Sequence, residues 1–199
     1  PRKKQGKILG GVPLGGHEKA YPGGAGIVPR ESVRIGVVSD THMFSRGKKL
    51  PDKLVEGLTG VDLILHAGDF TDPAVIPLLE RIAPLEAVAG NNDGIEIVRR
   101  FGYRRIVHAG GRKIGLVHGH MGPGRTAEAA ANLAFRDEDV DIVVFGHSHV
   151  PHYEWTPEGR LLFNPGSPTD KRWQARYSYG LIEIGERVEA VHRYYDDKS

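Results

Sequence analysis

Short apolar runs alternate with amphipathic segments from residue 32 onward. Residues 33–38, 62–65 and 85–89 are apolar runs, rich in β-branched side chains, with the length of buried strands. Between them, residues 51–58 and 73–82 place apolar side chains at helical spacing, and Pro51 suits a first helical turn. This strand–helix alternation predicts a parallel sheet with right-handed crossovers.

The pattern changes after residue 100. Segments 104–108 and 113–117 read as strands of a hairpin, because residues 109–112 form a glycine-containing turn. An alanine-rich helix is expected at 125–135, followed by a buried strand at 141–145. Four further strands, at 152–156, 160–163, 177–184 and 187–195, are expected to be antiparallel. The pattern predicts one α/β domain at 32–199 with two sheets, the second largely antiparallel.

Residues 1–31 differ from the rest of the sequence, because their start is basic and their middle is rich in glycine. They carry neither strand nor helix periodicity, so we expect a flexible extension. The alternative is an arm that packs on a neighbouring subunit or binds acidic groups.

Composition limits the classes of function. The 199 residues include 27 basic and 25 acidic side chains, a net charge of +2. This balance gives no general electrostatic reason to expect nucleic acid or a membrane surface as partner. No apolar run approaches the roughly 20 residues that span a bilayer, and the start lacks a secretory pattern. The absence of cysteine excludes disulfides and Cys-ligated zinc, and we expect a soluble, cytoplasmic protein.

Five short polar blocks stand at the downstream ends of predicted strands. Since ligand sites in α/β sheets form at the carboxyl ends of strands, the blocks are expected to converge on one rim. Each block is weak evidence alone, and the set in this order is specific. The blocks are Asp40-Thr41-His42, Gly68-Asp69, Gly90-Asn91-Asn92-Asp93, His118-Gly119-His120 and Gly146-His147-Ser148-His149.

The side chains of these blocks offer carboxylate, carboxamide and imidazole groups without thiolate. Such ligands suit Mn²⁺, Ni²⁺, Zn²⁺, Fe or Mg²⁺ in an open site. They outnumber what one ion needs, so we expect two divalent metal ions, with Mn²⁺ favoured. A metal pair activates a bridging water and neutralises phosphoryl oxygens, which points to phosphoester hydrolysis.

As an ordered set, the blocks resemble the calcineurin-like metallophosphoesterase superfamily. The chain length, the His118-Gly119-His120 spacing and Asn164-Pro165-Gly166-Ser167 resemble its small YfcE-like phosphodiesterase branch. The resemblance covers residue 33 to the C-terminus. It implies a four-layer α/β/β/α sandwich with two mixed β-sheets flanked by helices.

The resemblance also implies roles for particular residues. Asp40, His42 and His149 would hold one metal, Asn91, His118 and His147 the other, and Asp69 would bridge them. The expected reaction is in-line attack by metal-bound hydroxide on a small phosphodiester.

Asn92 departs from the wider superfamily, where a His at this place can protonate the leaving oxygen. Asparagine cannot act as a general acid, so good leaving groups are expected to react far faster. YfcE-like proteins also depart there, commonly with Cys. Asp93 and His120 complete the candidate catalytic set of Asp69, Asn91, Asn92, Asp93 and His120. They would orient His118 or a water, or form only local turn and helix-start hydrogen bonds.

Three alternatives stay open. The first is a phosphomonoesterase or nucleotidase of the same fold. The second is a non-catalytic metal-binding scaffold for protein contacts, similar to the retromer subunit of this architecture. A nuclease is less expected, given the charge balance and Asn92. A homo-oligomer is compatible with the sequence, although no interface signature is present.

Residues outside the blocks are expected to have structural rather than catalytic roles. Arg46, Lys48 and Lys49 are expected in a solvated loop rather than on a substrate phosphate, and His66 is expected to pack beside Gly68-Asp69. Four aromatic residues are read as core or subunit contacts rather than base-stacking platforms: Trp155, Trp173, Tyr194 and Tyr195.

Overall fold

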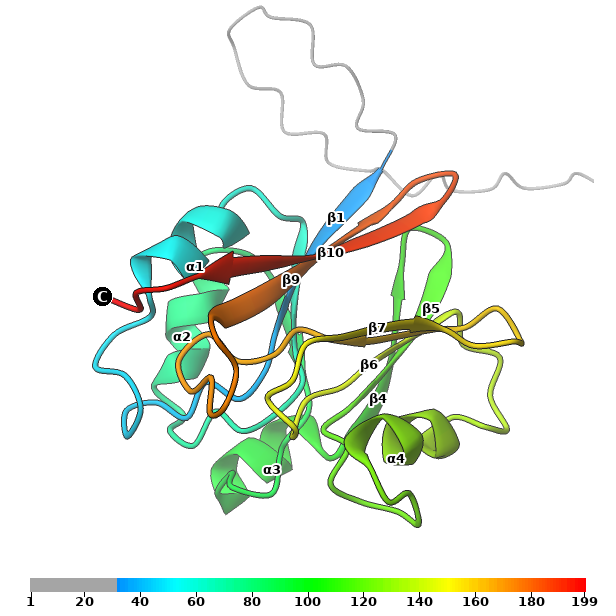
Figure 1. Cartoon of the computed structure of the whole chain (residues 1–199), viewed down its shortest axis with the longest axis horizontal. Coiled ribbons are helices and arrows are strands. Elements are labelled where there is room, and N and C mark those ends of the chain that lie inside the picture. Colours follow the sequence, from blue (N-terminus) through cyan, green and yellow to red (C-terminus); the bar gives the residue numbers. More distant parts are fainter. Residues whose placement is uncertain (1–31) are drawn as a thin grey trace, which may run out of the picture.

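The computed structural model describes residues 32–199, so the extension expected at 1–31 lies outside the described residues. Ten strands and four helices are found within residues 32–199 (Figure 1). In chain order they are β1 (Val33–Val38), α1 (Asp52–Leu58), β2 (Leu63–His66), α2 (Val75–Glu80), β3 (Leu85–Ala87), α3 (Ile95–Phe101), β4 (Arg104–Ala109), β5 (Arg112–Val117), α4 (Ala127–Ala134), β6 (Ile142–Val144), β7 (His152–Trp155), β8 (Leu161–Asn164), β9 (Tyr177–Ile184) and β10 (Val188–Tyr195).

The first sheet has the strand order β10-β9-β1-β2-β3. Strands β1, β2 and β3 are parallel, as the strand–helix alternation predicts, with Ile35 opposite Leu63. On the other side of β1, strand β9 pairs antiparallel with Gly36 opposite Leu181, and β10 pairs antiparallel with β9. The three parallel strands therefore bring their carboxyl ends to one edge of the sheet.

The second sheet has the order β4-β5-β6-β8-β7. Its outer pairs, β4–β5 and β7–β8, are antiparallel, whereas β5–β6 and β6–β8 are parallel. The expectation of a largely antiparallel second sheet is therefore wrong, and the C-terminal hairpin β9–β10 belongs to the first sheet. Hydrophobic period identifies a strand, but the partner of that strand is set by contacts far away in the sequence.

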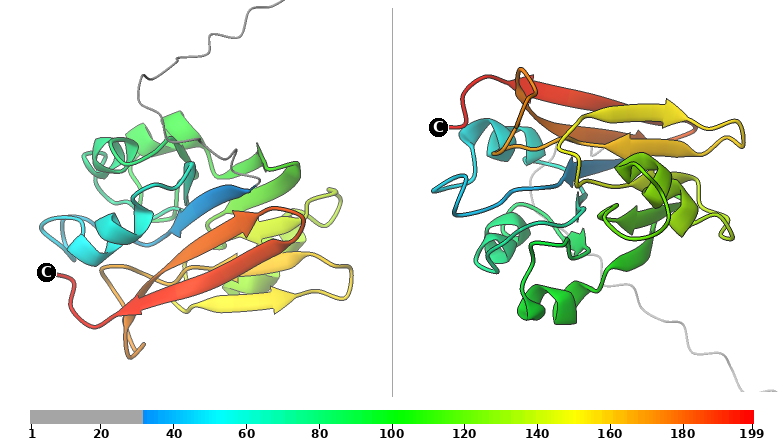
Figure 2. Two further views of the ribbon diagram at one scale, coloured as in Figure 1. Left: turned by 90° about the horizontal axis from the view of Figure 1, so that it is seen from above. Right: turned by 60° about the horizontal axis from the view of Figure 1, so that its bottom comes forward.

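Three hydrophobic clusters fill the spaces between the layers of the fold, and Figure 2 shows the ribbons of those layers from two further directions. Alternate residues of β1, Ile35 and Val37, pack between the sheets, while Val38 belongs to the cluster beneath α1, α2 and α3. Residues of α4 and the outer face of the second sheet, including Ala131 and Val143, form the third cluster. The implied four-layer α/β/β/α sandwich with two mixed sheets is confirmed.

Helix α3 is the element that the sequence pattern left out. It begins after Gly94, buries Ile97 and Phe101, and ends at Phe101, before Gly102, whose φ is +68°. Arg99 and Arg100 lie in its last turn, where cations suit the helix dipole. The signals were present in the sequence, since Gly102 is a favourable helix stop and Ile97 and Phe101 stand four residues apart.

The four aromatic residues that were interpreted as core or contact residues differ in their exposure. Tyr195 is 7% exposed and belongs to the core, whereas Trp173 is 98% exposed, so a core position for Trp173 is wrong. Trp155 and Tyr194 are about half exposed. Within residues 32–199, no helix has the length and apolar character needed to cross a membrane.

Candidate metal centre

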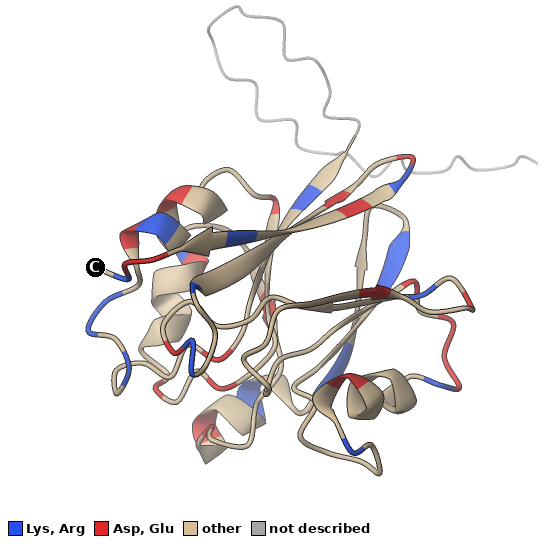
Figure 3. Cartoon of the chain, in the orientation of Figure 1, with Lys and Arg blue, Asp and Glu red and all other residues tan. Residues whose placement is uncertain are grey.

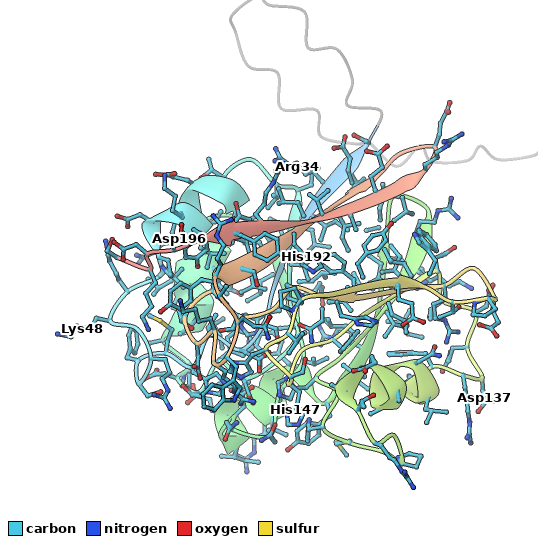
Figure 4. All side chains as sticks on the ribbon, in the orientation of Figure 1. Arg34, Lys48, Asp137, His147, His192 and Asp196 are labelled. Carbon is cyan, nitrogen blue, oxygen red and sulfur yellow. The ribbon has the colours of Figure 1, made fainter. Side chains whose placement is uncertain are left out.

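The five polar blocks meet where the carboxyl ends of both sheets come together. Loops after β1, β2 and β3 contribute from the first sheet, and loops after β5 and β6 contribute from the second. Figure 4 labels His147, which is seen between α3 and α4 at this rim. The convergence follows from the parallel direction of these strands, which the sequence predicts for the first sheet only.

Asp40 is fully buried and its two carboxylate oxygens have different surroundings. The Oδ2 atom accepts hydrogen bonds from Ser39 Oγ at 2.7 Å and from the backbone N–H of His147 at 3.0 Å. The Oδ1 atom has no hydrogen-bond donor among residues 32–199. It lies 3.4 Å from His149 Nε2 and 3.8 Å from the Nε2 atoms of His42 and His118.

Asp69 lies beside Asp40 and faces the same imidazoles. Its Oδ1 accepts the backbone N–H of Asn92 at 2.9 Å, and its Oδ2 accepts Asn92 Nδ2 at 2.7 Å. Asp69 Oδ2 is also 3.3 Å from His118 Nε2 and 3.4 Å from His42 Nε2. The Asp69 carboxylate is thus placed between two candidate ligand histidines.

Backbone carbonyls fix the orientation of two of these imidazoles. His118 Nδ1 is 2.7 Å from the carbonyl oxygen of Ala67, and His149 Nδ1 is 2.5 Å from that of Asp170. A carbonyl oxygen only accepts, so each Nδ1 carries the proton, and in the neutral ring Nε2 presents a lone pair. This arrangement is typical of metal-binding histidines.

Unpaired buried atoms test whether the residues fit a cation. Within residues 32–199, Asp40 Oδ1 and the Nε2 atoms of His42, His118 and His149 are buried without hydrogen-bond partners. Buried polar atoms are normally paired, because an unmade hydrogen bond costs about 1–3 kcal/mol. Here carboxylate oxygens and imidazole nitrogens face each other, an arrangement that a divalent cation between them stabilises. The donor set therefore fits a metal.

Two groups of ligand atoms lie close enough to share an ion. One is Asp40, His42 and His149, and the other is Asp40, Asp69 and His118; the atoms of each group are within 4.8 Å of one another. The first group is the first metal set that the family resemblance implies. Asp40 belongs to both groups, so its position is as central as that of Asp69.

The electrostatics of the centre favour charged carboxylates. Burial alone would raise the pKa of Asp40, but His42, His118 and His149 lower it below its ordinary value. Burial likewise opposes ionisation of Asp69, and His118 and Asn92 hold the pKa of its carboxyl well below normal. Burial lowers the pKa of His149, which favours the neutral ring that a metal requires.

Unusual backbone conformations concentrate at this centre. Within residues 32–199, seven non-glycine residues have φ between +41° and +70°. Five of the seven are candidate ligands, namely Asp40, His42, Asp69, His147 and His149; the others are Thr71 and Arg172. Such conformations cost of order 1–3 kcal/mol each and persist where surrounding contacts hold them, most often at functional sites.

Two glycines let the backbone approach the carboxylates. A Cβ at Gly90 would lie 2.1 Å from Asp69 Oδ1, and a Cβ at Gly146 would lie 1.8 Å from Ser39 Oγ and 2.7 Å from Asp40 Oδ2. Both glycines open a polar block, so their place in the motifs has a steric cause.

The remaining candidate residues, Asn91, Asn92 and His120, differ in their surroundings. Asn91 is exposed, and no hydrogen bond of its side chain is found within residues 32–199, so its role as a ligand stays a prediction. Asn92 instead contacts Asp69. His120 is half-buried, its ring 5.3 Å from that of His118 and 6.2 Å from that of His147. His120 thus lies beside the candidate ligands, and its role also stays a prediction.

Asp93 forms local hydrogen bonds, which is one of the two roles that the sequence predicts for it. Its carboxylate accepts the backbone N–H groups of Asp69, Thr71 and Gly90 at 2.8–2.9 Å. It thereby holds the loop of Asp69, whereas His118 is oriented by the Ala67 carbonyl.

Several positioning residues were missed from sequence. Asn164 is buried and donates to the carbonyl of Gly146 and to Ser148 Oγ, which holds the loop of His147 and His149. Ser167 Oγ donates to the carbonyl of Asp40 at 2.7 Å. The Asn164-Pro165-Gly166-Ser167 motif was the available signal.

The basic residues after the first block, Arg46, Lys48 and Lys49, differ in their surroundings. Lys49 pairs with Asp52 at 2.8 Å, and Figure 4 shows Lys48 pointing away from the molecule. Arg46 differs, because it lines an open basin together with His42 and Asn92.

Known proteins support the interpretation of this centre. Residues 33–187 match the model of the calcineurin-like phosphoesterase superfamily domain. A probable metallophosphoesterase of Methanothermobacter thermautotrophicus is 38% identical over 159 residues, which cover 78% of this chain and 89% of that protein. A probable metallophosphoesterase of Methanocaldococcus jannaschii is 34% identical, with 78% of each chain covered.

A solved structure shares the fold at lower identity. Vps29 of Entamoeba histolytica complexed with Zn²⁺ superposes with a TM-score of 0.66 at 23% identity, covering 81% of this chain and 99% of that one. The match of the family model, the two archaeal relatives and the His/Asp centre together establish that this chain belongs to the calcineurin-like phosphoesterase superfamily.

Proposed function

We propose that the chain is a phosphodiesterase that works with two divalent metal ions. The observation that carries the proposal is the convergence of four buried, unpaired ligand atoms from Asp40, His42, His118 and His149 on one rim. Family membership makes the chain a metallophosphoesterase. The preference for diesters over monoesters is what we propose in addition.

The ligand assignment divides the blocks between two ions. Asp40, His42 and His149 would hold one ion, Asn91, His118 and His147 the other, and Asp69 would lie between them. When bound, such ions offset phosphoryl charge and lower the pKa of water toward about 7. The Vps29 structure with Zn²⁺ supports divalent metal binding by this fold.

The charge in the basin beside the centre favours a diester, whereas Asn92 limits the leaving group of either kind of ester. Asn92 occupies a position next to Asp69 but cannot supply a proton to a leaving oxygen. In the adjoining basin, Arg46 Nε lies 3.7 Å from Asp170 Oδ2, so its charge is partly balanced. Arg172 is exposed and has no ion-pair partner within residues 32–199, so the protein adds one unbalanced cation to the charge of the metal ions, which suits a phosphodiester better than a doubly charged monoester.

A non-catalytic role in protein contacts is the second candidate. The likeness of fold to Vps29, a protein named for vacuolar protein sorting, supports it. Nucleic acid is a poorer partner, since Figure 3 shows basic and acidic residues interspersed along the chain without a continuous basic stripe in this view.

Hydrolysis by metal-stripped protein tests the proposal. Bis-p-nitrophenyl phosphate and p-nitrophenyl phosphate would be compared with Mn²⁺, Ni²⁺, Zn²⁺ or Mg²⁺ added separately. Restored activity that favours the diester supports the proposal. Equal or better hydrolysis of the monoester contradicts it, and no activity with metal bound favours the scaffold.

Asp69→Asn provides the residue-level test. The carboxamide keeps the size of the side chain but loses the charge between the two ligand sets, so turnover should be abolished with the fold retained. Asp137→Asn is the matched control, because Asp137 is 87% exposed beside Arg136 and lies outside the centre. Full activity of the Asp69 variant would refute the assignment.

A further inference from the structure

The loop between β8 and β9 is fastened to the metal centre. Beyond the Ser167 bond to Asp40, the carbonyl of Pro168 accepts Tyr195 Oη at 2.6 Å, and the carbonyl of Thr169 accepts Lys198 Nζ at 2.8 Å. The next carbonyl, that of Asp170, orients His149. The residues that follow are therefore held in a fixed place beside the candidate ligands.

The loop then makes a tight turn that presents two side chains. The N–H of Gln174 donates to the carbonyl of Lys171 at 2.8 Å, so Arg172 and Trp173 are the two central residues of the turn. Lys171 folds back, with Nζ donating to the carbonyl of Ala175 at 2.8 Å and lying 5.1 Å from the ring centre of Tyr177. Arg172 and Trp173 are left at the tip.

Both side chains face a hollow that opens onto the centre. This basin of about 560 Å³ is lined by His42, Arg46, Asn92, Asp170, Arg172 and Trp173. Trp173 is 98% exposed, so its indole packs on almost nothing within residues 32–199. Arg172 lines this hollow together with His42, a candidate ligand, so its side chain stands beside the centre.

We propose that Trp173 is a stacking platform for a nucleobase, and that the substrate class is a small nucleoside phosphodiester whose phosphate Arg172 contacts. This inference rests on the proposed phosphodiesterase function. A bare indole provides a flat π-face, and stacking on it is tolerant of the identity of the base. The other five residues of the basin are polar, which suits the polar edges of a nucleobase better than an alkyl chain.

The size of the partner is limited by charge. A strand of nucleic acid binds through many phosphates and needs a row of cations. Of the two arginines in the basin, Arg46 is shared with Asp170, which leaves Arg172. The geometry therefore favours a single phosphodiester rather than a strand.

Two substrates with one leaving group separate stacking from chemistry. The p-nitrophenyl ester of thymidine 5′-monophosphate carries a base, and methyl p-nitrophenyl phosphate does not. In metal-loaded protein, Trp173→Ala should raise KM for the thymidine ester by about 5- to 150-fold, with kcat little changed. KM for the methyl ester should stay within about twofold, and Trp173→Phe should retain most of the affinity.

A matched variant and a second readout complete the test. Trp155→Ala removes the other tryptophan, which lines a different hollow with Arg112 and Asp141, and should leave both KM values unchanged. In a Trp155→Phe background, thymidine 5′-(methyl phosphate) should quench the fluorescence of Trp173 without turnover being needed.

The outcomes are distinct. An unchanged KM for the thymidine ester in Trp173→Ala, an equal loss with both esters, or a clear preference for oligonucleotides would overturn the inference. Quenching without hydrolysis of either ester would refute the phosphodiesterase function while supporting the nucleobase platform. Absence of both quenching and a KM effect would reject the platform alone if the methyl ester is still hydrolysed.

Discussion

A methyl group added at Gly90 should displace the carboxylate of Asp69. The Cβ of Gly90→Ala would lie 2.1 Å from Asp69 Oδ1 and 2.6 Å from the backbone nitrogen of Asp69, whereas ordinary contact begins at 3.4 Å. The oxygen must therefore move by about 1.3 Å, the difference between 3.4 and 2.1 Å. The backbone nitrogen is restrained, because it donates to Asp93 Oδ2 at 2.9 Å.

This displacement has consequences for both stability and activity. Overpacking of this kind typically costs about 1–3 kcal/mol, so the free energy of unfolding in metal-free urea titrations should fall by that amount. A catalytic group misplaced by about 1 Å can cost about 100-fold, so kcat/KM for bis-p-nitrophenyl phosphate with Mn²⁺ should fall to that extent.

Gly94→Ala is the matched control in the same loop. Apart from its two chain neighbours, no heavy atom of residues 32–199 lies within 4 Å of a Cβ at this position, and its φ of −73° is open to alanine. Its free energy of unfolding should stay within about 0.5 kcal/mol of the parent protein. If Gly90→Ala kept parental stability and kcat/KM, the steric reasoning would be refuted. Equal losses in both variants would point to a general sensitivity of the loop.

Metal binding, the titration of His66 and the choice of leaving group each test the centre in a different way. Mn²⁺ at 100 times its Kd should raise the free energy of unfolding by about 2.7 kcal/mol relative to protein in chelator. The corresponding rise in Tm is about 5–10 °C. An unchanged Tm would argue against a buried metal site. Burial lowers the pKa of His66 from 6.5 to about 3, so the unfolded state takes up a proton below pH 6.5 while the folded state does not. Metal-free protein should therefore lose about 2 kcal/mol from this group between pH 7 and pH 5, and His66→Asn should show a smaller pH dependence in urea titrations; the same pH dependence in both proteins would contradict the assignment. Because Asn92 cannot protonate a leaving oxygen, methyl p-nitrophenyl phosphate should lose nitrophenolate at least about 100-fold faster than dimethyl phosphate loses methoxide, and equal kcat values would show that another acid acts there.

The periodicity of the sequence was enough to find most elements and the rim of the centre. Runs such as residues 33–38 and 62–65 predicted the parallel strands β1 and β2, and parallel strands must deliver Asp40 and Asp69 to the same edge. The family resemblance added the four layers, which the three hydrophobic clusters confirm. The short helix α3 was missed, although Gly102 marked its end.

What the sequence could not determine depends on contacts between distant segments. The pairing of β9 with β1 in the first sheet has no local signal, because a strand's period says which face is buried but not which strand lies beside it. The carbonyls of Ala67 and Asp170 that orient His118 and His149 belong to the backbone, and a backbone carbonyl is the same for every residue type. Exposure is equally a tertiary property: the sequence determined that a tryptophan stands at position 173, and only the anchored turn placed its ring at the mouth of the centre.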